Sequence, residues 1–214
     1  MRLLLFLLPF FSLLHAASAP QLFKEFSFGE PKQKVLEGMK TNGCVDPRGR
    51  DVLCIDDYRF LDLSFRMVLF YEEEKLVSLV LTTEHTPENE SLIYDTMGKK
   101  FFMVGMSNDR GEKLDIFALM KRALRENNFP LLKEKVETFK ERSGDSPITT
   151  SFLDKQTYFA IGKQCANIPD LMKNADEQSR SLDLSMKNRL IFLQFTCPVA
   201  HKKAKKTKRE MEDF

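Results

Sequence analysis

The chain has 214 residues, a formal net charge of +2, 19 phenylalanines and no tryptophan. This length suits one domain or two small ones, and the near balance of charge excludes an overall basic field that would attract nucleic acid. Neither a phosphate-binding glycine loop nor a dinucleotide fingerprint occurs in the sequence.

Residues 1–19 are predicted to be a signal peptide. Arg2 precedes an apolar run at 3–14, and Ala17-Ser18-Ala19 fits the small-residue rule for cleavage. Pro20 disfavours a cut at that point, so cleavage after Ala16 or slightly later is an equal alternative. The run is shorter than the roughly 20 residues of a membrane span. The sequence therefore predicts a periplasmic or secreted protein with one domain at 20–200.

The four cysteines are expected to form two disulfides in an oxidising compartment. Three pairings exist, and we favour Cys44 with Cys54 and Cys165 with Cys197. The first pair would close a short loop that contains the turn residues Asp46-Pro47. Metal or redox chemistry is the alternative use of cysteine, but the sequence has no C-x-x-C and no histidine at ligand spacing.

The first part of the chain is expected to form mainly strands. A short strand at 23–28 precedes a helix at 30–43, and a strand at 51–58 follows. The apolar runs at 65–71 and 76–83, separated by the charged residues 72–75, predict an antiparallel hairpin. Thr86-Pro87 then has the N-cap and first-turn residues of a helix.

The middle of the chain, 86–144, is predicted to be helical. Phe101 and Phe102 are taken to extend the apolar side of the helix that begins at Thr86, and two amphipathic helices around 114–124 and 132–139 follow. Strands are expected at 149–153, 157–161, 182–186 and 189–197, with the last two forming a hairpin that turns at Lys187-Asn188.

Grouped strands and helices predict an α+β fold, with an antiparallel sheet and helices packed on one face. Leu-Asp-Leu-Ser occurs twice, at 61–64 and 182–185, each time before an apolar run. This match suggests two related halves, 20–85 and 145–200, joined by the helical segment. A chance match of common residues is the competing interpretation.

The segment 23–83 resembles a family of small envelope proteins. Its phenylalanine-rich start, the helix 30–43 and the strands with a charged turn are similar to outer-membrane-assembly lipoproteins of the SmpA type and to β-lactamase-inhibitor-protein-like domains. Gly29, Val35, Phe70, Lys75 and Leu76 occupy matching positions. This chain lacks the family's lipid-anchor cysteine and adds a helical middle. The resemblance implies a noncatalytic envelope adaptor.

Catalytic chemistry has few candidate residues in the predicted domain. His85 is its only histidine, and it is expected to be a hydrogen-bonded loop residue. The remaining candidates are carboxylates, because Asp56, Asp57, Asp62 and Asp183 would converge if the two Leu-Asp-Leu-Ser strands were neighbours. Solvent-facing strand positions are the competing interpretation. We assign no catalytic residue, cofactor or metal.

Residues 201–214 are predicted to be a basic, disordered tail. Six cations are present in eight residues, and they could contact anionic lipid or a polyanion: Lys202, Lys203, Lys205, Lys206, Lys208 and Arg209. The sequence thus favours an exported, non-enzymatic binding or adaptor protein that recognises a protein or another ligand through a sheet edge or an apolar surface. The alternative is a secreted hydrolase with a carboxylate pair.

Overall fold

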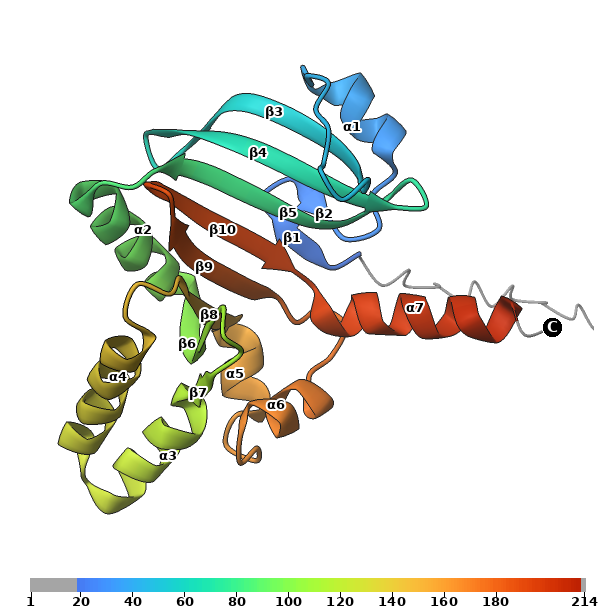
Figure 1. The fold of residues 1–214 in the computed structure, drawn as a ribbon. Helices are drawn as coiled ribbons and strands as arrows, with labels where there is room; N and C mark the ends of the chain where they lie inside the picture. The colour runs from blue at the N-terminus through green and yellow to red at the C-terminus, as the bar shows by residue number, and fades with distance from the viewer. Residues whose placement is uncertain (1–18, 213–214) are drawn as a thin grey trace, which may run out of the picture.

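The computed structural model describes residues 19–212 as an α+β fold built on one large antiparallel sheet, which confirms the predicted class (Figure 1). The predicted signal peptide lies outside the described residues except for Ala19. The eight strands of the large sheet have the order β3-β4-β5-β10-β9-β8-β6-β7, and a separate hairpin pairs β1 with β2.

The strands and helices alternate in groups along the chain. The strands are β1 (Gln21–Phe23), β2 (Phe26–Ser27), β3 (Asp51–Phe60), β4 (Leu63–Glu72), β5 (Lys75–Glu84), β6 (Phe101–Asn108), β7 (Lys113–Asp115), β8 (Ile148–Asp154), β9 (Ser181–Lys187) and β10 (Leu190–Thr196). The helices are α1 (Lys32–Gly38), α2 (Pro87–Lys100), α3 (Ile116–Glu126), α4 (Phe129–Ser143), α5 (Lys155–Ile161), α6 (Ile168–Asn174) and α7 (Pro198–Glu212).

Alternation along the central strands builds the main core on one face of the sheet. Every second residue of β4, β5, β9 and β10 is buried on that face, which we call the packed face: Phe65, Met67, Leu69, Leu79, Leu81, Leu182, Leu184, Ile191, Leu193 and Phe195. The β1–β2 hairpin, α1 and α2 cover it with Phe23, Phe26, Val35, Ile93 and Met97. Since strand side chains alternate between faces, the intervening residues point to the opposite side.

The β5–β10 ladder joins two three-stranded meanders into one sheet. Leu81 pairs with Leu193, Met67 lies opposite Leu81, and Leu184 lies opposite Leu193, so buried positions of β4 and β9 correspond. When β4 and β9 are aligned in chain direction with Met67 on Leu184, Ser64 falls on Ser181 and not on Ser185. Residues 61 and 62 also lie in the β3–β4 turn with positive φ, whereas 182–185 lie inside β9. The repeated Leu-Asp-Leu-Ser therefore does not mark equivalent positions.

In the described part of the chain, helices cover the other face only at the end formed by β6 and β8. Leu153 of β8 is buried there with Val104, Phe117, Cys165 and Leu171, which come from β6, α3, the α5–α6 connection and α6. Elsewhere, α3 and α4 pack against Met106 and form a hairpin that points away from the sheet (Figure 1). Within residues 19–212, the opposite face of β3, β4, β5 and β10 therefore has no covering helix (Figure 1).

Three expectations about local structure differ from the structure. Residues 101–108 form β6 instead of extending α2, and 157–161 belong to α5 instead of a strand. Asp154 caps α5 by accepting a hydrogen bond from the backbone of Thr157, and this cap favours the helix. Residues 198–212 form α7 where a disordered tail was expected from 201. The helix continues directly from β10, and its first turn packs on the core through Ala200.

Only one of the two expected disulfides is present. Cys44 and Cys54 are bonded, whereas Cys165 and Cys197 are free. Cys197 follows β10 in the main core, and Cys165 packs in the separate cluster around Leu153. Both thiols are fully buried, and burial raises the pKa of Cys197 to about 12 and also raises that of Cys165.

This cysteine chemistry predicts a simple thiol count. The native protein should expose no rapidly reacting thiol, and protein denatured without reductant should titrate two thiols per chain. Reduction before denaturation should raise the count to four. A count of zero in the denatured, unreduced protein would show that Cys165 and Cys197 are oxidised and would contradict the structure.

Candidate functional site

The uncovered sheet face between β3 and β10, which we call the open face, carries a contiguous set of half-buried apolar side chains. Register places them side by side, since Val52 pairs with Phe70, Val68 pairs with Val80, and Thr82 pairs with Phe192. The apolar members are Val52, Val68, Phe70, Val80 and Phe192. Polar residues such as Gln194 continue the face toward β9.

A hollow of about 560 Å³ lies over the open face, within the size range of ligand sites. The strands form its floor, and the segment 44–50, which we call the rim loop, contributes its wall. Val45 in this loop has 91% of its surface exposed, the largest fraction among the exposed large apolar side chains. An apolar side chain at the rim of an apolar floor is typical of a surface that a partner covers.

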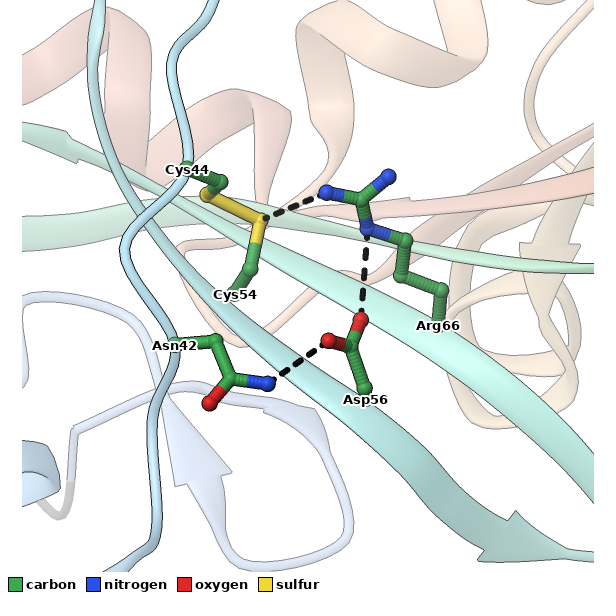
Figure 2. Close-up of a disulfide and its surroundings, with 5 residues drawn as sticks. All are labelled: Asn42, Cys44, Cys54, Asp56 and Arg66. Carbon is green, nitrogen blue, oxygen red and sulfur yellow. Dashed lines mark hydrogen bonds and ion pairs between the residues drawn. A yellow bond between two sulfur atoms is a disulfide. The ribbon is translucent and has the colours of Figure 1, made fainter.

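The disulfide fixes the rim loop to the edge of the sheet (Figure 2). Before the bonded Cys44, the backbone N–H of Asn42 donates to the carbonyl of Cys54 at 2.8 Å, and its side chain donates to Asp56 at 2.6 Å. Asp56 also pairs with Arg66 of β4 at 3.4 Å. The crossing segment therefore occupies part of the outer edge of β3.

Arg50 anchors the other end of the rim loop. Its guanidinium donates two hydrogen bonds to the carboxylate of Asp46, at 2.8 and 2.9 Å, and stacks 4.2 Å from the centre of the Phe70 ring. The hydrogen bonds from Arg50 lower the pKa of Asp46 to about 2. Charge pairing and cation–π contact thus hold the loop against the floor of the hollow.

The sheet edges offer less than the face for binding. The segment that contains Asn42 covers β3 at Cys54, and β7 at the opposite end is only three residues long. Short or covered edges are a common protection against strand pairing between chains. Of the two surfaces expected from the sequence, the apolar face is therefore the better formed.

The candidate carboxylates do not form a cluster. Asp56 and Asp183 lie on β3 and β9, which are four strand spacings apart, or about 19 Å. Asp57 accepts a hydrogen bond from Ser64 near the end of β3, and Asp62 lies in the β3–β4 turn. Glycoside hydrolysis needs two carboxylates within roughly 5–10 Å. The geometry gives no support to a pair of this kind.

Asp183 is the most enclosed of these carboxylates. It lies on the polar part of the open-face side and accepts a 2.6 Å hydrogen bond from Ser151. Burial raises its pKa above the ordinary value. His85 pairs with Glu90 at 2.8 Å between β5 and α2 and is not part of this group, in agreement with a hydrogen-bonded loop histidine. Among the described residues, no group of histidine, cysteine and acidic side chains could hold a metal ion.

The basic tail residues lie along α7, away from the rim loop. Lys203 pairs with Glu177, and Lys205 pairs with Glu72 at 3.4 Å. Glu72 also contacts His201. Lys202 and Lys206 are exposed on the same helix, whereas the side chains of Lys208 and Arg209 lie outside the described residues. Part of the predicted polyanion surface is thus already paired with carboxylates.

Sequence reasoning did not find the open face as a site. The sequence of β4 and β5 does not distinguish core residues from those of an uncovered face, because both faces of these strands are apolar. The sequence does contain one signal for this site, since the apolar Val45 stands between Cys44 of the predicted disulfide and the turn residues Asp46-Pro47.

Comparison of the chain with protein-family models, with curated proteins and with solved structures found no match. No helix in the described part of the chain is long and apolar enough to span a membrane.

Removing the disulfide should destabilise the protein. Closing this short loop restricts the unfolded chain, so Cys44→Ser/Cys54→Ser should lower the free energy of unfolding by about 3 kcal/mol. Urea denaturation followed by circular dichroism measures the change. Reductant should destabilise the wild-type protein by a similar amount and leave the double variant unchanged. Equal stability of the oxidised wild type and the variant would contradict the role of the bond.

The Asp46–Arg50 pair should titrate at an unusually low pH. The folded-state pKa of Asp46, about 2, lies below the ordinary value of 3.8. The pair therefore adds stability above about pH 4 and loses it as the pH falls through 2. NMR titration of the Asp46 carboxyl carbon should give this low midpoint, and Arg50→Gln should raise it. A midpoint near 3.8 in the wild type would contradict the bidentate contact.

Proposed function

We propose that the protein is an exported, non-enzymatic binding protein and that its open face binds a partner protein. The observation that carries the proposal is the contiguous apolar floor beside the exposed Val45. A sheet face of this kind is normally covered by another layer of secondary structure. Here α1 and α2 cover the packed face, whereas the open face has no such layer in the described chain.

The charges around the hollow favour a partner with acidic residues at the edge of its apolar surface. Arg48, Arg50 and Arg66 line the hollow with one carboxylate, Asp46. Arg50 is paired with Asp46 and Arg66 with Asp56, while Arg48 is exposed and forms no ion pair among the described residues. Apolar contact would supply most of the affinity, and the arginines would select the orientation.

Two features support export. The N-terminal sequence has the pattern of a signal peptide, and the Cys44–Cys54 bond is of a kind found mainly in oxidising compartments. The resemblance of 23–83 to small envelope proteins remains a prediction, and it is consistent with an adaptor role in a periplasm. Fractionation of cells that produce the full chain would test the compartment, since a cytoplasmic location would contradict this part of the proposal.

Quantitative capture from native envelope extracts tests the role of the open face. Val68→Glu/Val80→Glu places two carboxylates on the apolar floor, and Leu92→Glu changes an apolar residue that is 40% exposed on α2. The proposal expects a stoichiometric protein partner whose recovery falls at least about tenfold with the first variant and is unchanged with the second.

Two results would contradict this function. Partners recovered equally with all three proteins would show that the open face is not the binding surface. A wild-type homodimer that becomes monomeric in Val68→Glu/Val80→Glu would show that a second copy covers the face. Circular dichroism of both variants must match the wild type, because the substituted side chains are partly exposed and should not prevent folding.

A further inference from the structure

A second hollow, of about 780 Å³, lies between α3, α4 and the segment 163–166. Leu114, Ala118 and Leu119 give it an apolar floor. Its charged lining contains five cations and a single carboxylate: Lys121, Arg122, Arg125, Lys135, Lys163 and Asp115. We call it the basic groove, and it lies apart from the open face on the far end of the sheet.

Internal contacts neutralise the groove only in part. Asp115 accepts hydrogen bonds from the backbone N–H groups of Ala118 and Ile168, at 2.8 and 2.9 Å. Both oxygens of its carboxylate therefore bind backbone groups of the protein. Lys121 donates to the carbonyl of Gly162 at 3.1 Å. Arg122 pairs with Glu126 at 3.0 Å, and Lys135 pairs with Glu134 at 3.4 Å. Arg125 and Lys163 are exposed and have no carboxylate partner among the described residues. The groove therefore keeps cationic groups available for an anion.

Exposed apolar side chains lie next to the groove at the tip of the α3–α4 hairpin. Leu124, near the end of α3, is 60% exposed, and Phe129, the first residue of α4, is 49% exposed. Asn127 adopts the left-handed conformation between the helices, and Asn128 caps α4 by accepting from the backbone of Leu131. The tip is thus a closed turn at the end of the hairpin farthest from the sheet (Figure 1).

We propose that the α3–α4 hairpin docks on a bilayer that contains anionic phospholipid. The basic groove holds a headgroup phosphate through Arg125 and Lys163, and Leu124 and Phe129 enter the interfacial region. Guanidinium and ammonium groups are the usual ligands of phosphate in proteins, and apolar residues flanked by cations are typical of peripheral membrane contact. A soluble phosphate ligand would explain the cations but not the exposed apolar tip.

This surface differs from the basic tail expected to contact lipid. Lys203 and Lys205 of α7 are paired with carboxylates of the body, whereas Arg125 and Lys163 are not. The inference is also independent of the proposed protein partner, because the open face and the basic groove share no lining residue.

Vesicle co-sedimentation tests the proposal with protein expressed with its own leader and with its N-terminus determined by mass spectrometry. The wild type should bind vesicles of phosphatidylcholine and phosphatidylglycerol in 0.1 M salt, bind phosphatidylcholine alone weakly, and dissociate in high salt. Arg125→Glu/Lys163→Glu should lower the partition coefficient at least about thirtyfold. Lys99→Glu/Lys100→Glu makes the same change of charge on exposed residues of α2 and should change binding little.

The apolar contribution and the source of phosphate need separate measurements. Leu124→Ser/Phe129→Ser should weaken vesicle binding about tenfold and lower the melting temperature only slightly, since about half or more of each side chain is exposed. In calorimetry, pyrophosphate should bind the wild type only weakly.

Three results would overturn membrane docking. The first is absence of wild-type binding to anionic vesicles, and the second is equal loss in the groove and α2 variants. The third is tight, groove-dependent binding of pyrophosphate without vesicle binding, which would assign the groove to a soluble phosphate ligand.

Discussion

The alternation of side chains in β4, β5 and β10 is the constraint on which the rest of the structure depends. One set of alternate residues, which includes Leu69, Leu81 and Leu193, is fully buried under α1, α2 and the β1–β2 hairpin. The other set is also apolar at several positions, among them Val68, Val80 and Phe192, yet it remains half-buried. A sheet that is apolar on both faces favours a further layer on the second face, and the described chain does not provide one there.

The disulfide and the arginine contacts give this second face a fixed boundary. The Cys44–Cys54 bond holds the rim loop at the outer strand, and Arg50 stacks on Phe70 at its other end. A surface that is already rigid loses little conformational entropy when a partner binds. The same contacts cover part of the β3 edge, so they direct recognition toward the face of the sheet.

Much of the fold was predictable because its signals are local. The hairpins of β4–β5 and β9–β10 and the cap of α2 at Thr86 follow from alternation, turn residues and a cap. The strand β6 was not, because its run from Phe101 is continuously apolar and follows α2 without a break. Such a run is buried by tertiary packing on both sides and carries no periodic signal. The prediction of a second disulfide was wrong for a related reason. No local pattern shows that Cys165 and Cys197 belong to different hydrophobic clusters.

The uncovered state of the open face can be measured directly by carbene footprinting of the free protein, with labelled residues identified by mass spectrometry. Alternate residues on the same strands provide the internal comparison. The account predicts labelling of Val68, Val80 and Phe192 and protection of their neighbours Leu69, Leu81 and Leu193. Equal protection of both sets in the monomeric protein would show that part of the chain covers this face, and it would contradict the account.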